Sequence, residues 1–239
     1  MKNNIFNFKD FKVCQSQSSM KIGTDAVLLG AWTKIPEMAQ SILDVGAGTG
    51  ILALQMAQRS FAEIIDAVEI DPGAFEECVD NFENSPWGDR LYCYHSDFHN
   101  FAKEIDETYD LIISNPPFFE VSENLSTKER STARSQTDLN FETLLLGVNQ
   151  LLHPEGTLSV IVPYTSSEGF IKMAAKVDLY PNQLLNVRGH ASSPLKRSLI
   201  TFKRSKEETS EQCELIIELK RHVYTKNYID LVKDFYLKM

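Results

Sequence analysis

The stretch Ser41-Ile42-Leu43-Asp44-Val45-Gly46-Ala47-Gly48-Thr49-Gly50 decides the fold of this chain. Its first half is mostly apolar, as in a strand that is covered on both faces of a parallel sheet. Three glycines follow at alternate positions, Gly46, Gly48 and Gly50, and they let the backbone turn sharply and pass close to a ligand where a Cβ would collide. Residues 51–58 favour a helix, and the turn delivers the free N–H groups of that helix to one place. The stretch therefore predicts a strand, a ligand-binding turn and a helix.

A turn of this kind serves either a dinucleotide or another cofactor with an adenosyl group. The pyrophosphate-binding pattern is G-x-G-x-x-G, and the glycine spacing here differs from it. Asp44 would repel a pyrophosphate but is suited to pair with an ammonium group. Glu69 ends the next apolar run, about 20 residues on, where an acid accepts the ribose hydroxyls. The combination favours S-adenosylmethionine, which has a zwitterionic amino-acid part and no phosphates.

Length and composition are those of an ordinary globular protein. The 239 residues are 43% hydrophobic and 24% charged, and we expect one domain over 1–239, with 1–36 as an N-terminal extension near the cofactor site and 37–239 as the core. No apolar run approaches the roughly 20 residues that span a bilayer, and no signal peptide is evident, so we expect a cytoplasmic protein. The scattered cysteines and histidines predict free, mostly buried thiols and no metal site.

The net charge of -9 and the pI near 5.1 argue against a protein that coats nucleic acid without specificity. These whole-chain values do not exclude a local basic patch. Two groups of cations are candidates, each being either a solvated surface or such a patch. They comprise Lys128, Arg130 and Arg134 in one segment, and Lys196, Arg197, Lys203, Arg204 and Lys206 in another.

Strand-like and helix-like segments alternate along the chain, which predicts a mostly parallel sheet with helices on both faces. We expect a short amphipathic strand or hairpin around Phe6, Phe8 and Phe11, and a helix over 26–32 capped by Thr24 or Asp25. The expected strands cover 41–45, 63–69, 91–95, 109–114 and 157–162, and the expected helices 51–59, 71–82, 101–105, 139–152 and 166–177. An antiparallel pair over 184–189 and 198–202, an extended run over 214–219 and a terminal helix or ordered tail over 228–237 complete the chain.

Polar residues follow the first four core strands of this pattern, at the carboxyl edge where such sheets bind ligands. They are Asp44 with Gly46, Glu69 with Ile70, Asp97 with Phe98, and Asn115. The Asp97 carboxylate is suited to accept from the amine of an adenine and the next amide to donate to the ring, although an N-cap of the following helix is the alternative reading. Lys21, Thr24 and Asp25 form a dense polar set beside an apolar run, which makes Lys21 and Thr24 further candidate cofactor contacts. The alternative reading is an N-terminal helix that only packs across the sheet.

The segment Asn115-Pro116-Pro117-Phe118 follows the fourth strand and carries the strongest chemical signal. Two prolines fix the backbone and remove two N–H donors, so an Asn oxygen and a proline carbonyl both remain free to accept from one donor. The Phe118 ring offers a face for stacking. A planar group bearing NH2 fits this arrangement: adenine, cytosine or a glutamine amide. The alternative is a rigid structural turn.

Such an amine is a poor nucleophile because its lone pair is delocalised. Holding both hydrogens on Asn115 and Pro116 turns the lone pair toward the methyl group of the cofactor. The reaction is an in-line displacement at a sulfonium carbon, in which alignment supplies most of the acceleration. A base inside a nucleic acid would be flipped out and stacked on Phe118.

With these motifs in view, the chain resembles the Rossmann-like class I methyltransferases that carry an N-P-P-[YF] motif. Within them it resembles the bacterial tRNA1(Val) (adenine(37)-N6)-methyltransferase family, which modifies the adenine beside the anticodon. The likeness spans nearly the whole chain. It rests on 20–32, Asp44 to Gly50, Ala67 to Asp71, Ser85-Pro86-Trp87, Ser114 to Phe119, Lys196-Arg197 and the tail 231–237.

The resemblance implies a seven-stranded, mostly parallel sheet with a C-terminal antiparallel hairpin, and S-adenosylmethionine as cofactor. It implies that Asp44 and Gly46 hold the methionine part, Glu69 the ribose, and Asp97 with Phe98 the adenine. Residues 115–118 would hold the target base. The tRNA substrate would meet Arg130, Arg134 and their neighbours, with no membrane and no obligate protein partner. Two departures stand out: Phe118 replaces the commoner Tyr, and Arg134 precedes Ser135 where a His is usual.

Two other readings remain open. A glutamine amide of a protein such as a release factor fits the same pocket, but enzymes of that kind generally carry an N-terminal helical domain, for which this chain has little room before Gly46. A noncatalytic RNA-binding or cofactor-sensing module is disfavoured, because the turn, the acid and the N-P-P-F motif occur together in workable order.

Overall fold

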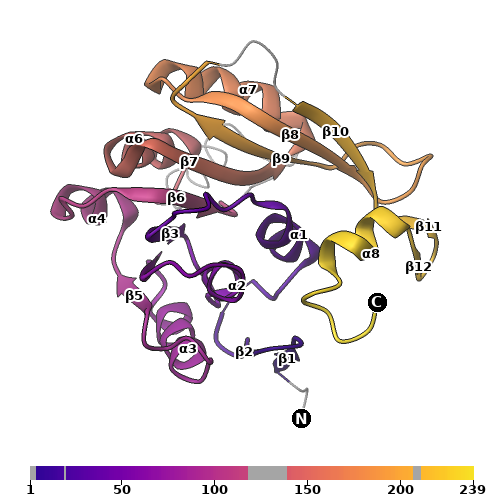
Figure 1. Cartoon of the computed structure of the whole chain (residues 1–239), viewed down its shortest axis with the longest axis horizontal. Coiled ribbons are helices and arrows are strands. Elements are labelled where there is room, and N and C mark those ends of the chain that lie inside the picture. The colour runs from indigo at the N-terminus through magenta and orange to yellow at the C-terminus, as the bar shows by residue number, and fades with distance from the viewer. Residues whose placement is uncertain (1–3, 19, 118–138, 207–210) are drawn as a thin grey trace, which may run out of the picture.

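A computed structural model describes residues 4–18, 20–117, 139–206 and 211–239. Its centre is a sheet of eight strands in the order β10-β8-β9-β7-β6-β3-β4-β5 (Figure 1). All of them run parallel except β9, which is antiparallel to both of its neighbours. The strands are β3 Ser41–Val45, β4 Ile64–Glu69, β5 Leu91–His95, β6 Tyr109–Ser114, β7 Leu152–Pro163, β8 Tyr180–Arg188, β9 Arg197–Lys203 and β10 Glu211–Ile216.

Helices cover both faces of the sheet (Figure 1). One face is packed by α1 Thr24–Trp32, α2 Ile51–Arg59, α3 Pro72–Glu83 and α8 Lys226–Val232. The other is packed by α4 Phe98–Glu104, α6 Phe141–Leu151 and α7 Tyr164–Ala174, which continues into the short helix η1 Ala175–Val177. No helix in these described parts of the chain is long and apolar enough to cross a membrane.

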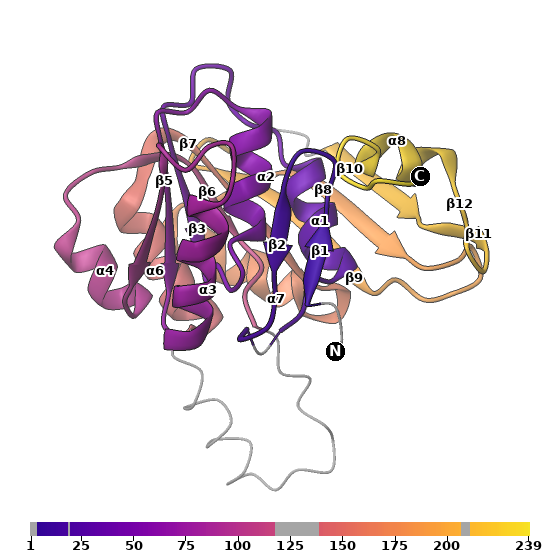
Figure 2. The same cartoon turned by 90° about the horizontal axis from the view of Figure 1, so that it is seen from below.

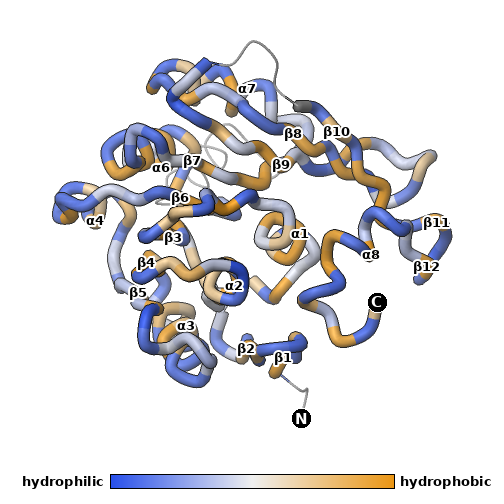
Figure 3. Tube along the Cα trace, viewed as in Figure 1, coloured by the Kyte–Doolittle hydropathy of each residue, from blue (hydrophilic) through white to orange (hydrophobic). Residues whose placement is uncertain are grey.

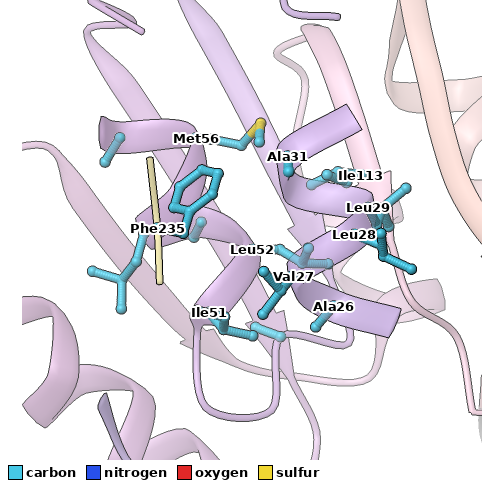
Figure 4. Close-up of a cluster of buried hydrophobic side chains, with 14 of the residues drawn as sticks. Ala26, Val27, Leu28, Leu29, Ala31, Ile51, Leu52, Met56, Ile113 and Phe235 are labelled. Atoms are coloured by element: carbon cyan, nitrogen blue, oxygen red, sulfur yellow. The ribbon is translucent and has the colours of Figure 1, made fainter. Parts of the chain in front are cut away.

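The side chains of each core strand alternate between two hydrophobic cores. In β6, Leu111 and Ile113 belong to the core beneath α1 and α2, and Ile112 to the core beneath α4 and α6. Figure 4 shows Val27 of α1 pointing toward Leu52 of α2 in the first core. Because strands buried on both sides are nearly continuous apolar runs, Figure 3 shows the central strands and α1 mainly in hydrophobic colours.

Two hairpins lie outside the main sheet. β1 Ile5–Asn7 and β2 Lys12–Cys14 pair beside α3, and the bridge between Phe8 and Tyr236 joins this hairpin to the C-terminal tail (Figure 2). β11 Glu218–Lys220 and β12 Val223–Tyr224 form the second hairpin, beyond β10. The predicted N-terminal hairpin is thus confirmed, with Phe8 and Phe11 buried.

The fold class is confirmed, with one strand more than the seven expected. The additional strand is β10, which falls on the expected extended run near 214–219 and pairs with the edge strand β8. The expected antiparallel pair is β8 with β9. Strand β7 begins at Leu152, because the expected turn over 153–156 is a bulge in its pairing with β6.

Three local expectations were wrong. Helix α1 is capped by Gly23 without a side-chain hydrogen bond, because Asp25 instead pairs with Arg197. Helix α4 begins at Phe98, three residues early, since Asp97 caps it. The cysteines form no disulfide but are mostly not buried: of the four, Cys78 alone is buried, and Cys14 and Cys213 are exposed.

Candidate functional site

Strand register brings the predicted site residues to one edge of the sheet. Val45 pairs with Val68 on one side and with Ser114 on the other. Gly46 and its two neighbours along this edge, Glu69 and Asn115, are therefore level, one residue beyond that row. The glycine turn, the acid and the N-P-P motif thus meet at the carboxyl ends of β3, β4 and β6.

The glycine turn is held in a shape that L-residues with a Cβ rarely adopt. Gly46, Gly48 and Gly50 have φ of 74°, 55° and 77°. The N–H groups of Gly46 and Ala47 both donate to the Val68 carbonyl, at 2.9 and 3.1 Å, which fixes the turn on β4. Hydrogen bonds within the fold thus hold the loop in this conformation.

The last two glycines face different surroundings. A Cβ on Gly50 would lie 2.5 Å from the Phe82 ring and 2.8 Å from the Cys78 sulfur of α3. A Cβ on Gly48 would meet nothing within 4 Å. Gly50 therefore serves packing, whereas Gly48 borders the open side of the turn.

Exchanging each of these glycines for alanine separates the two roles. We expect Gly50→Ala to lower the free energy of unfolding by about 2–4 kcal/mol, from the left-handed backbone and the clash with α3. Gly48→Ala carries only the backbone cost, about 1–2 kcal/mol, and, if the turn binds the S-adenosylmethionine expected from the sequence, it should weaken that binding by about tenfold or more. Urea unfolding and calorimetric titration measure the two effects. Unchanged cofactor affinity in Gly48→Ala would show that the open side is not the cofactor site.

Asp44 is fully buried beneath the turn. Its Oδ2 accepts from the Ala53 N–H at 3.1 Å, in the first turn of α2, which has no side-chain cap of its own. Its Oδ1 is buried without a hydrogen-bond partner. Burial, with a smaller contribution from Glu69, raises the pKa of Asp44 to about 7. A buried acceptor with one unused oxygen fits a cationic donor such as the ammonium of a bound amino acid.

The Glu69 carboxylate, at the end of β4, accepts backbone hydrogen bonds on both oxygens. Its Oε2 accepts from the Gly48 N–H at 2.7 Å, and its Oε1 accepts from the N–H groups of Ile70 and Asp71 at 2.9 and 2.8 Å. These bonds fix the carboxylate against the glycine turn. A carboxylate has about four lone-pair sites, so the Oε2 atom retains capacity for a hydroxyl donor.

The remaining candidate cofactor-binding residues, Asp97, Phe98 and Ile70, differ in their burial and in their hydrogen bonds. Asp97 caps α4 by accepting from the Asn100 N–H at 3.1 Å, so the alternative reading of this residue is confirmed. The Phe98 side chain is buried in the core, and its backbone N–H, in the first turn, has no acceptor within the helix. Ile70 is 44% exposed beside Glu69.

Lys21 and Thr24 lie on the chain that leads into α1. Thr24 is exposed, and Lys21 donates to the carbonyls of Gln15 and Ser18. The segment before them is held by Glu77 of α3, which was not among the predicted residues. Its carboxylate accepts from the N–H groups of Ser16, Gln17 and Ser18 and from both serine hydroxyls. These bonds hold the pKa of Glu77 at about 2, although burial opposes them.

Asn115 carries an unused acceptor at the centre of this edge. Its Oδ1 is buried and has no hydrogen-bond partner. Pro116 is buried behind it, and neither proline has an N–H to offer. The Ser114 hydroxyl donates to the Val45 carbonyl at 2.8 Å, which ties the start of this motif to the strand of the glycine turn. A Cβ added to Gly46 would lie 3.3 Å from the side chain of Leu139, so this residue lies close to the glycine turn.

The expected RNA contacts are only partly described. Phe118, Lys128, Arg130 and Arg134 lie outside the described residues. Lys196 is exposed at the start of β9, on the same edge as Asn115, whereas Arg197 pairs with Asp25 at 2.7 Å. The other three cations, Lys203, Arg204 and Lys206, lie at the opposite end of β9, away from the site.

Comparisons with known proteins agree with this geometry. Residues 9–164 match the family model described as "Methyltransferase small domain". A tRNA1(Val) (adenine(37)-N6)-methyltransferase of Flavobacterium psychrophilum is 50% identical over 235 residues, which are 98% of this chain and 100% of the relative. Proteins of the same description from Christiangramia forsetii and Bacteroides fragilis are 48% and 43% identical, covering 100% and 98% of this chain and the same shares of theirs.

Solved structures share the fold at low sequence identity. A predicted O-methyltransferase from Agrobacterium tumefaciens superimposes with a TM-score of 0.69 at 21% identity, covering 88% of this chain and 96% of the other. A putative RNA methyltransferase from Pyrococcus horikoshii reaches 0.52 at 16% identity, covering 76% and 82%. These similarities support the architecture alone.

Proposed function

The chain belongs to the tRNA1(Val) (adenine(37)-N6)-methyltransferase family, and on that premise we propose that it methylates the exocyclic N6 amine of adenine 37 in tRNA1(Val). The observation that carries this proposal is the unpaired, buried Asn115 Oδ1 beside the glycine turn. An orphaned buried acceptor is costly unless a ligand satisfies it. An amine with two hydrogens is such a ligand.

We propose S-adenosylmethionine as the cofactor, which supplies a methyl group on a sulfonium. Asp44 would hold its ammonium, because that carboxylate is buried with one free oxygen. Glu69 would accept the ribose hydroxyls, and Asp97 with the Phe98 N–H would contact the adenine. Gly46, Gly48 and Gly50 would let the backbone approach closely, with Lys21, Thr24 and Ile70 at the rim of the site.

The residues of the N-P-P-F motif would orient the target base. The Asn115 Oδ1 and the Pro116 carbonyl would accept the two amine hydrogens, and Pro117 would keep the turn rigid. Phe118 would stack on the base. With both hydrogens held, the nitrogen lone pair points out of the ring plane, and alignment supplies most of the acceleration. No strong base is needed, since the methylated ammonium is acidic enough to lose its proton afterwards.

Cations would contact the RNA, with Lys196 and Arg197 in the described part and Lys128, Arg130 and Arg134 outside it. We propose that residues 1–239 act as one methyltransferase domain, in the cytoplasm where tRNA is processed, without an obligate protein partner.

Two parallel incubations distinguish this function from the two alternative functions. Radiolabelled cofactor is supplied with unmodified tRNA1(Val) in one reaction and with a release factor in another. We expect label in the tRNA alone, and mass spectrometry of the digested tRNA should locate it at adenine 37. Label in the release factor would support glutamine methylation, and label in neither, despite cofactor binding, would support a noncatalytic module.

Asp44 gives the proposed cofactor site a pH dependence with a defined sign. Its pKa near 7 means that the carboxyl is mostly protonated below pH 7, and a bound ammonium favours its ionised form. Binding should therefore release a proton, and affinity should rise about fivefold between about pH 6 and pH 7. Calorimetry in buffers of different ionisation enthalpy measures both quantities.

The controls isolate the Asp44–ammonium contact. Affinity for methylthioadenosine, which lacks the amino-acid part, is expected to stay constant over the same range. Asp44→Asn should remove the pH dependence, because its side-chain oxygen still accepts from Ala53 but does not titrate. Cofactor affinity that does not change with pH in the unaltered protein would refute the contact.

A further inference from the structure

An exposed aromatic residue and three exposed cations continue the catalytic edge beyond Asn115. Tyr164, at the end of β7, is 41% exposed. Lys196 lies beside it at the start of β9, and Lys220 and Arg221 lie at the tip of the hairpin β11–β12. We call these four residues the edge strip. The hairpin lies beyond β10, beside α8 (Figure 1).

Backbone hydrogen bonds fix the strip to the sheet. The Tyr164 N–H donates to the Lys196 carbonyl at 3.0 Å, and the Lys196 N–H donates to the Val187 carbonyl at 2.8 Å. One strand further, the Glu218 N–H donates to the Gly189 carbonyl at 2.8 Å, which anchors the start of β11. These bonds hold Tyr164, Lys196 and the base of the hairpin against the sheet.

Strand order gives the distances along the strip. Asn115 follows β6, and the strands beyond it are β7, β9, β8 and β10. At about 4.8 Å per strand, Tyr164 lies roughly 5 Å and Lys196 roughly 10 Å from the strand of Asn115, with the hairpin at roughly 20 Å. The strip thus begins next to the target-base position and leads away from the cofactor side.

Internal ion pairs leave the strip positive although the whole chain is acidic. Residues 188–206 contain no Asp or Glu. Two acids near this edge pair with arginines: Glu214 with Arg188 at 2.8 Å, and Asp25 with Arg197 at 2.7 Å. Glu218 faces His190 at 3.5 Å. Lys196, Lys220 and Arg221 form no ion pair within the described residues, so their charges face solvent.

We propose that the edge strip binds the single-stranded RNA that flanks the target adenine, a proposal that rests on the function proposed above. Tyr164 stacks a base next to the flipped adenine, replacing stacking that the flip removes. The three cations neutralise successive backbone phosphates. The strip thereby adds to the other proposed RNA contacts, so that a protein of net charge -9 binds RNA through a local positive surface.

Salt dependence distinguishes phosphate contacts from stacking. We expect the triple variant Lys196→Ala, Lys220→Ala, Arg221→Ala to reduce the slope of log K against log salt by about 2, near 0.7 per lost contact on a single strand. The matched control is Lys176→Ala, an exposed lysine in η1 near the opposite edge of the sheet, which should leave the slope unchanged. Affinity for unmodified tRNA1(Val) transcript is measured by filter binding over a range of KCl concentrations.

Tyr164 should affect affinity without affecting the slope. Tyr164→Ala is expected to weaken tRNA binding about tenfold, whereas Tyr164→Phe, which keeps the ring, should bind as the unaltered protein does. If the unaltered protein methylates the tRNA but the triple variant keeps its slope, or Tyr164→Ala keeps its affinity, the strip is refuted and the function stands. If the unaltered protein methylates no tRNA, both proposals fall together.

Discussion

Replacing Asn115 with Ala is expected to lower kcat for methyl transfer to tRNA by about 10³-fold, in the range seen when one preorganised polar group is removed from an active site. The Oδ1 atom is the buried acceptor without a partner that faces the position proposed for the target amine. Without it, the lone pair of the amine stays delocalised into the ring, and its alignment with the methyl group is lost. Single-turnover assays with saturating cofactor measure the chemical step.

Cofactor affinity should stay within a few-fold of the unaltered value, because Asp44, Glu69 and the glycine turn are unchanged. The matched control is Asn227→Ala, an exposed asparagine on α8, which should keep full activity. A loss of cofactor affinity as large as the loss of rate would contradict the division of roles between β3–β4 and β6. Equal activity of Asn115→Ala and the control would refute the orienting role proposed for Asn115.

The parts of the fold that the sequence predicted are those with strong local signals. The apolar run 41–45, the glycine turn and the helix over 51–59 were predicted with the bounds that the structure has. The placement of polar residues at the carboxyl edge followed from parallel alternation, and the register of β3 with β4 and β6 agrees with it. Local patterns suffice here because each strand is buried on both sides.

The errors arise where a distant partner decides the structure. Asp25 reads as a helix cap, but Arg197, 172 residues away, takes its carboxylate. The start of α4 is the exception, because a local partner, the Asp97 cap, decides it. Strand β10 joins the sheet only through its pairing with β8. The pattern of hydrophobic residues within the strand therefore could not show that it belongs to the main sheet.

Glu77 is the functional neighbour that sequence reasoning missed. It is one of two adjacent acids on an amphipathic helix, and Glu76 beside it is exposed. Its partners, Ser16 to Ser18, lie 59 to 61 residues away, and a run of small polar residues does not reveal which carboxylate it surrounds. The closeness of this segment to the site follows from the packing of α3 against β2.

Glu77→Gln is expected to lower the free energy of unfolding at about pH 7 by about 3 kcal/mol, since a shift of the pKa from 4.5 to about 2 is worth about 1.4 kcal/mol per unit. The amide keeps one acceptor oxygen but turns a donor toward N–H groups of residues 16–18. Because the folded-state pKa is depressed, the stabilisation is complete above about pH 5 and is lost as the pH falls toward 2. The difference in free energy of unfolding between the unaltered protein and Glu77→Gln, measured by urea unfolding, should therefore shrink at acid pH.

Glu76→Gln removes the same charge one residue away and should change stability by less than about 0.5 kcal/mol, as exposed substitutions do. Releasing residues 16–18 also frees the chain that leads to Lys21 and Thr24. If those residues contact the cofactor as proposed, Glu77→Gln should bind S-adenosylmethionine several-fold more weakly, and Glu76→Gln should bind it normally. A Glu77→Gln protein as stable as Glu76→Gln at neutral pH would show that the carboxylate does not hold the N-terminal segment, and normal cofactor affinity in a destabilised Glu77→Gln would place Lys21 and Thr24 outside the cofactor site.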